Sequence, residues 1–95
     1  MNEYIQRQIQ LMTMFIDQYE KGSIDLNALV HKLEGLATLP EMADVRVQIG
    51  SLIGDLEEFN AWILDEGNLP EHSIDKLRQK LNGIKIALSG YESKR

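Results

Sequence analysis

Apolar residues recur at spacings of three and four along most of the chain, which is the pattern of amphipathic α-helices. Alternation of apolar and polar residues at a period of two, which marks a half-buried strand, is not found in the sequence. Glycine and proline divide the helical pattern into four segments. We therefore predict an all-α protein, an irregular up-and-down four-helix bundle with helices at about residues 3–21, 26–36, 39–66 and 69–89.

The first two predicted helices have recognisable signals where one ends and the next begins. Gly22 follows the first periodic segment and suits the left-handed residue that closes a helix. Asp25 precedes the second segment and can accept hydrogen bonds from the free amides of its first turn. These signals predict a short connection between two neighbouring helices.

The third predicted helix is the longest and carries a heptad stripe of apolar residues. Gly50 and Gly54 lie in its middle, where each costs up to about 1 kcal/mol relative to alanine. They predict either a close approach of a neighbouring helix or a bend. The stripe consists of Met42, Val45, Ile49, Leu52, Leu56, Phe59 and Ile63.

Helix-start signals precede the third and fourth segments. Thr38 stands three residues before Glu41, and this spacing predicts a capping box that starts the third helix. Asn68 and Glu71 repeat the spacing before the fourth segment. Gly90 marks the predicted end of the fourth helix.

Composition narrows the class of protein more than its function. The 95 residues suffice for one domain, residues 1–95, and no apolar run reaches the roughly 20 residues that a membrane span needs. The chain has no cysteine and its start shows no signal peptide, so we expect a cytoplasmic protein. The net charge of −5 argues against direct binding to nucleic acid, which needs a basic surface.

Residue types that carry out catalysis are scarce in the sequence. His31 and His72, the two histidines, project from the polar faces of their helices and are typical of solvated surface histidines. His31 and Glu34 have a spacing that could hold a metal, but only one copy is present, and it faces outward. No nucleophile elbow or phosphate-binding loop is recognisable. We therefore predict no catalytic residue, no metal site and no cofactor, and we expect that the protein is not an enzyme.

The distribution of charge is more informative than its total. Residues 1–71 hold thirteen acids and four bases, whereas residues 72–95 hold two acids and six bases. Two acids lie in the last turn of the third helix, where the helix dipole disfavours negative charge. A sequence selected for stability alone would not place acids there. An acidic helix surface that carries one aromatic anchor is typical of binding to a basic protein partner. The candidate partner-binding residues are Asp55, Glu58, Trp62, Asp65 and Glu66.

A second interpretation explains the same residues by folding alone. The fourth helix is basic and is expected to run antiparallel to the third, so that the acids of the third helix can pair with it. In that case Trp62 closes the end of the core. The bases concerned are Lys76, Arg78, Lys80 and Lys85.

The segment FIDQYEKGSID at residues 15–25, together with Leu29 and Leu33, resembles the helix–glycine–helix opening of colicin-D-like immunity proteins. This family of small helical bacterial proteins, like the immunity proteins of contact-dependent growth inhibition, neutralises nuclease toxins. The resemblance implies stoichiometric binding to a basic toxin domain, whose active site or RNA-binding surface is covered. Two other functions remain open: a helical dimerisation or adaptor module, and a small secretion chaperone. The predicted state is a monomer or a homodimer.

Overall fold

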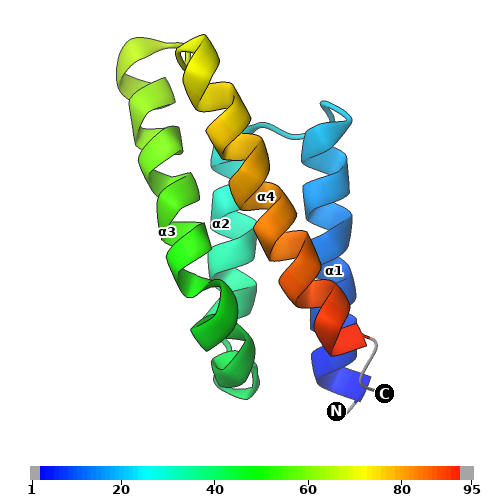
Figure 1. Ribbon diagram of the computed structural model, residues 1–95. Coiled ribbons are helices and arrows are strands. Elements are labelled where there is room, and N and C mark those ends of the chain that lie inside the picture. The colour runs from blue at the N-terminus through cyan, green and yellow to red at the C-terminus, as the bar shows by residue number, and fades with distance from the viewer. Residues whose placement is uncertain (1–2, 93–95) are drawn as a thin grey trace.

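The computed structural model describes residues 3–92, in which the chain forms helices and no strand. Each long helix packs against its neighbours in chain order, and α1 also packs against α4, which closes the ring. Successive long helices run in opposite directions (Figure 1). The predicted all-α four-helix bundle is therefore confirmed. The elements are α1 (Glu3–Glu20), α2 (Leu26–Ala37), the 3-10 helix η1 (Pro40–Met42), α3 (Ala43–Glu66) and α4 (Glu71–Glu92).

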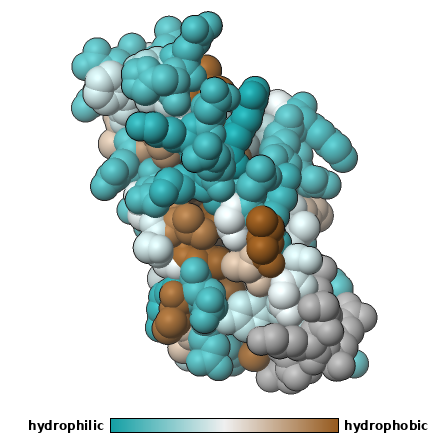
Figure 2. Space-filling view, in the orientation of Figure 1, coloured by the Kyte–Doolittle hydropathy of each residue, from teal (hydrophilic) through white to brown (hydrophobic). Residues whose placement is uncertain are grey.

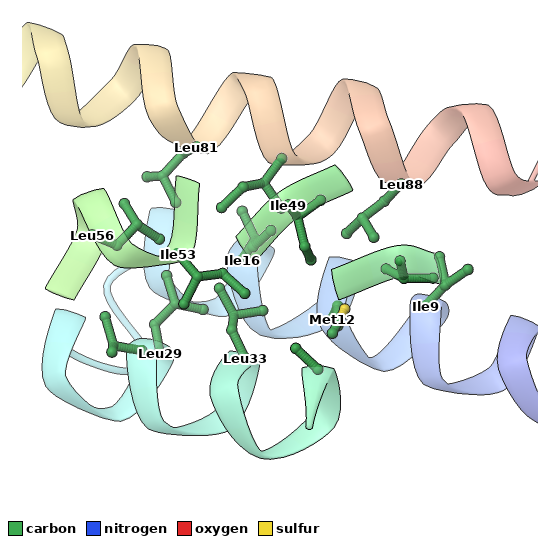
Figure 3. Packing of buried hydrophobic residues seen from close by; sticks show 14 of the residues in the cluster. Ile9, Met12, Ile16, Leu29, Leu33, Ile49, Ile53, Leu56, Leu81 and Leu88 are labelled. Carbon is green, nitrogen blue, oxygen red and sulfur yellow. The ribbon is translucent and has the colours of Figure 1, made fainter. Parts of the chain in front are cut away.

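The core runs along the axis of the bundle and draws on all four long helices. Figure 3 shows Ile16 of α1, Leu33 of α2, Ile49 of α3 and Leu81 of α4 pointing into one shared interior. These four side chains are at most 2% exposed. The apolar stripes that the sequence predicts thus face one another, and burial of this surface stabilises the fold.

The connection between α1 and α2 follows the sequence-based prediction. Gly22 has a φ of +82°, and its amide donates to the Tyr19 carbonyl at 3.0 Å while the Ser23 amide donates to the Gln18 carbonyl at 2.8 Å. This pair of bonds is a Schellman motif. The Asp25 carboxylate then accepts from the Ala28 amide at 2.8 Å and caps α2. The ends of α1 and α2 lie within one residue of the predicted positions.

The predicted start of the third helix is wrong. Thr38 has helical φ and ψ of −84° and −6°, whereas a capping residue needs an extended backbone. Its hydroxyl instead donates backward to the Gly35 carbonyl at 3.1 Å, so Thr38 closes α2. Leu39 is extended, as expected for a residue before proline, and α3 begins only at Ala43, after η1.

The fourth helix is also shifted from its predicted range. The helix begins at Glu71 rather than residue 69, because Pro70 holds the residue before it out of the helical region. The Pro70 carbonyl accepts the first helical amides, those of Ser73 and Ile74. The helix continues through Gly90 to Glu92. Tyr91 explains the extension, since its ring packs against the core and its hydroxyl donates to the Asp44 carbonyl at 3.0 Å.

Gly83 is the glycine of α4 that lies against α3. A methyl group on Gly83 of α4 would lie 3.2 Å from Leu52 Cδ1 of α3. Gly54 has nothing within 4 Å of such a group, and Gly50 has only the Arg46 side chain at 3.8 Å. Of the two expectations for Gly50 and Gly54, the close approach of a neighbouring helix is therefore wrong, and the bend stays a prediction. Within residues 3–92, no helix is long and apolar enough to cross a membrane.

Candidate partner-binding surface

Asp55 is tied to α4 rather than free for a partner. Its carboxylate lies 3.1 Å from Lys80 Nζ, and the two side chains are 37% and 39% exposed. This ion pair is one that the folding-based interpretation of the acidic helix predicts. Asp55 therefore borders the candidate surface and already has its counter-charge within the bundle.

The remaining acids of the candidate set lie toward the carboxyl end of α3 and keep their charge uncompensated. Glu58, Asp65 and Glu66 are exposed, and none of them forms an ion pair with another residue in the described range 3–92. Asp65 and Glu66 occupy the last turn of α3, which contains no base. The carboxyl end of the helix dipole therefore adds to their negative potential.

Trp62 belongs neither wholly to the core nor wholly to solvent. The residue is 49% exposed, and its indole Nε1 donates to the Asn68 carbonyl at 3.0 Å. Because Asn68 lies in the connection between α3 and α4, this bond fixes the ring against that connection. The indole thus has a fixed orientation and an exposed part.

Four of the five predicted residues form one contiguous surface on α3. Trp62 follows Glu58 by four residues, and Asp65 and Glu66 follow Trp62 by three and four, so that each of the three acids neighbours Trp62 on the helix surface. We call these four residues the α3 acidic surface. Figure 2 shows hydrophilic surface around the α3–α4 connection and an apolar area over the lower half of α3 and α4.

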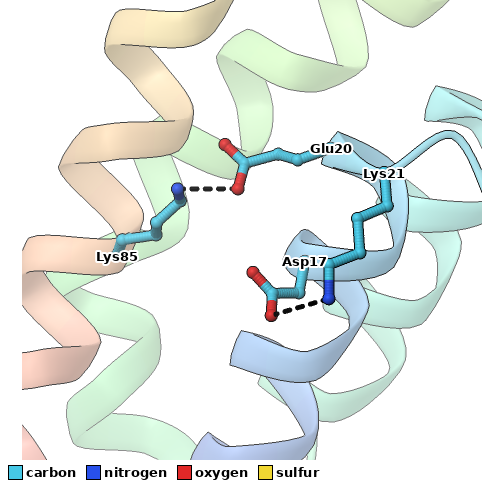
Figure 4. Close-up of polar contacts among 4 residues, drawn as sticks. All are labelled: Asp17, Glu20, Lys21 and Lys85. Atoms are coloured by element: carbon cyan, nitrogen blue, oxygen red, sulfur yellow. Dashed lines mark ion pairs between the residues drawn. The ribbon is translucent and has the colours of Figure 1, made fainter.

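The basic residues of α4 mostly have partners inside the bundle. Lys85 reaches across to Glu20 of α1 at 2.7 Å, and Figure 4 shows this pair beside the pair between Asp17 of α1 and Lys21, the residue after α1. Arg78 lies 3.8 Å from Asp75 on its own helix. These contacts leave the acids of the α3 acidic surface without a base of α4.

Glu34 of α2 and Glu57 of α3 form a pair of acids across the α2–α3 contact, which the sequence does not predict. A hydrogen bond with the Glu34 carboxyl raises the pKa of Glu57 above its ordinary value, and burial and the Glu34 charge act in the same direction. His31 acts in the opposite direction and lowers the pKa of Glu57. In residues 3–92, no group of three or more acidic or histidine side chains is arranged to hold a metal ion. The pairing depends on the register of α2 against α3, for which the sequence carries no local signal.

Asn60 of α3 is a buried polar residue that the heptad stripe does not predict. Asn60 is 8% exposed, and its Nδ2 donates to Asn27 Oδ1 of α2 at 2.9 Å. The heptad stripe passes from Leu56 through Phe59 to Ile63 and omits it. The signal that would find Asn60 is the second apolar row at Ile49, Ile53 and Leu56, which continues to it at a spacing of four.

Comparisons of the chain with models of protein families, with curated proteins and with solved structures found no significant match.

Proposed function

We propose that the protein is a toxin-neutralising immunity protein that acts in the cytoplasm and binds a basic nuclease-type toxin domain stoichiometrically through the α3 acidic surface. The observation that carries the proposal is the combination of three uncompensated acids with a half-exposed tryptophan of fixed orientation at one end of α3. Complementary charge accelerates association with a basic partner. An aromatic anchor held in place before binding contributes mainly to a slow dissociation.

The resemblance of residues 15–25 to the opening of colicin-D-like immunity proteins supports the same function. The Schellman motif at Gly22 and the cap at Asp25 show that this segment is a helical hairpin. The hairpin supports the proposed class of protein, and the acidic surface supports the mode of binding.

The test is coexpression with products of neighbouring genes in the source genome that arrest growth. We expect one of them to be a basic nuclease whose toxicity and activity are abolished at one equivalent of the protein. The double charge reversal Glu58→Lys with Glu66→Lys should then slow association and reduce its dependence on salt.

A matched control separates local charge from net charge. Glu3→Lys with Glu41→Lys changes the net charge by the same amount at the other end of the bundle, where both residues are exposed. This control should bind as the wild type does. Equal losses in the two double variants would reject the α3 acidic surface, and the absence of any rescued toxin would reject the function.

A homodimer is the second candidate, because two large apolar residues are strongly exposed away from the α3 acidic surface. Val47 of α3 is 81% exposed and Ile86 of α4 is 73% exposed. Exposed apolar area of this kind favours self-association when it is contiguous. Sedimentation equilibrium of the wild type and of Ile86→Lys distinguishes the cases: a dimer should dissociate in the variant, and a wild-type monomer would exclude this candidate.

A further inference from the structure

A small cavity opens between the start of α2 and the last turns of α3, at the end of the bundle that also carries the α3 acidic surface. Its volume is about 240 Å³. That is below the range of roughly 300–1,000 Å³ that is usual for pockets holding small molecules, so the cavity has room for a single long side chain. The residues that line it are Tyr19, Asp25, Leu26, Asn27, Asn60, Ile63 and Leu64.

The walls of the cavity are apolar, and its polar groups include a carboxylate and side-chain amide oxygens that accept hydrogen bonds. Leu26, Ile63 and Leu64 supply the apolar walls, and Leu64 is 68% exposed at the rim. Asp25 supplies a carboxylate, one oxygen of which caps α2 by accepting from the Ala28 amide. Such a lining suits a side chain with an aliphatic stem and a charged head, which buries the first and keeps the second at a polar rim.

Asn60 provides the most specific feature of the cavity. Its nitrogen donates to the Asn27 oxygen at 2.9 Å, and no hydrogen bond within residues 3–92 uses the Asn60 amide oxygen. Every fully covered side-chain nitrogen and oxygen in the described non-exposed residues has a partner. The Asn60 oxygen therefore reaches accessible space, and the cavity is the space that Asn60 lines. It offers an acceptor at a residue that is 8% exposed.

The local charge favours a cation as the occupant. The cavity lies between the carboxyl end of α3, where the helix dipole is negative, and the amino end of α2, where the Asp25 carboxylate offsets the positive dipole. Asp65 and Glu66 stand in the same last turn of α3 without lining the cavity. No base of residues 3–92 lines this cavity: Lys21 pairs with Asp17, and Arg78 lines the neighbouring cavity between α1 and α4, although its charge acts on Tyr19, which borders both cavities. An arginine side chain matches both features, because its guanidinium carries five donors and no acceptor.

We propose that this cavity between α2 and α3 receives an arginine side chain of a basic protein partner, with the guanidinium held by the Asn60 oxygen and the Asp25 carboxylate. The inference rests on the proposed function in one respect, that the partner is basic. It adds an anchor point on the α2 side of α3, at the same end of the bundle as the α3 acidic surface.

The experiment uses a probe in place of the partner, so that it does not depend on any toxin. The labelled protein is titrated with N-acetyl-arginine amide, and the side-chain amide signals of Asn27 and Asn60 are followed by nuclear magnetic resonance. We expect saturable shifts of both signals. N-acetyl-norleucine amide, which has an aliphatic stem without the charge, should bind at least tenfold more weakly, because a hydrogen bond to a charged group accounts for about that factor.

Two variants identify the groups that hold the probe. Asp25→Asn keeps a good capping oxygen for α2 and removes only the charge, so it should weaken binding while the fold is unchanged. Asn60→Leu removes the acceptor and should weaken binding about tenfold. Circular dichroism and the backbone spectrum of each variant show whether it has folded, and Asp25→Asn remains informative if Asn60→Leu does not fold.

Shifts that do not saturate, or equal affinity for the arginine and norleucine probes, would overturn the assignment of the cavity. Unchanged arginine affinity in both variants would do the same. Such a failure leaves the α3 acidic surface standing, because that surface is tested by Glu58→Lys with Glu66→Lys against the toxin. Conversely, saturable binding of the arginine probe in a protein that rescues no toxin would reject the proposed function and retain the cavity.

Discussion

Replacing Trp62 with alanine tests whether the indole ring is held against the bundle. A tryptophan of a core or an interface buries roughly 150–250 Å². Since Trp62 is 49% exposed, its packing covers about half of that area, or about 100 Å². At about 25 cal/mol per Å², the lost burial amounts to about 2.5 kcal/mol, and the lost hydrogen bond to Asn68 adds about 1 kcal/mol.

The sum is an upper value, because unfolded chains already bury about 10–40% of this area. We therefore expect Trp62→Ala to lower the free energy of unfolding by about 2–3 kcal/mol. Trp62→Phe keeps most of the ring and loses the donor, so its expected cost is about 1 kcal/mol. The Asn68 carbonyl stays accessible to water in that variant, because Asn68 is exposed.

Urea denaturation followed by far-ultraviolet circular dichroism measures both variants, since the chain has no other tryptophan to report unfolding by fluorescence. A loss below about 0.5 kcal/mol for Trp62→Ala would mean that the ring does not pack, and a loss above about 4 kcal/mol would mean that it is a full core residue. Either result would refute the half-buried, fixed ring on which the α3 acidic surface depends.

Three further predictions concern stability. Because the hydrogen bond to Glu34 raises the pKa of Glu57, the folded chain binds this proton more tightly than the unfolded chain, and the resulting stabilisation is present at low pH and is lost as the pH rises through the raised pKa. Glu57→Gln should therefore stabilise the protein by a few tenths of a kcal/mol near pH 7 and have little effect at about pH 4, and denaturation at the two pH values checks this. Thr38→Ala should cost less than about 0.5 kcal/mol in urea denaturation, because Thr38 caps no helix start; a loss of about 1 kcal/mol would restore the capping box. Gly54→Ala should raise stability by up to about 1 kcal/mol, whereas Gly83→Val should lower it by about 1–3 kcal/mol through contact with Leu52, and thermal unfolding that shows the reverse order would contradict the helix packing.

The helices and their buried faces could be predicted because both depend on local sequence periodicity. The roles of Gly22 and Asp25 could be predicted for the same reason, since a left-handed glycine and an acidic cap act within one turn of their own helix. Thr38 shows where local reasoning fails. Its spacing to Glu41 predicts a cap, but the extended backbone before Pro40 moves the start of α3 four residues along the chain.

The ion pairs of the candidate residues could be predicted only in part, because charges on one helix are neutralised by another. The sequence places Asp55 with the other acids of α3, yet the register of α3 against α4 brings Lys80 to it. Asn60 was missed for a related reason. A repeat of seven residues drifts around a helix with 3.6 residues per turn, so the buried face of α3 is wider than the stripe and includes Ile53 and Asn60.

The up-and-down order of the helices determines where a tag, a linker or a solid support can be joined without approaching the acidic surface. The beginning of α1 and the end of α4 lie at one end of the bundle, and the α1–α2 and α3–α4 connections lie at the other (Figure 1). The long axis of the bundle measures 41 Å. A tag, a linker or an immobilising group joined before α1 or after α4 therefore lies far from the acidic surface and from the arginine cavity. A molecule immobilised in this way exposes both the acidic surface and the arginine cavity. A fusion before α1 can be exchanged for one after α4 without covering either feature.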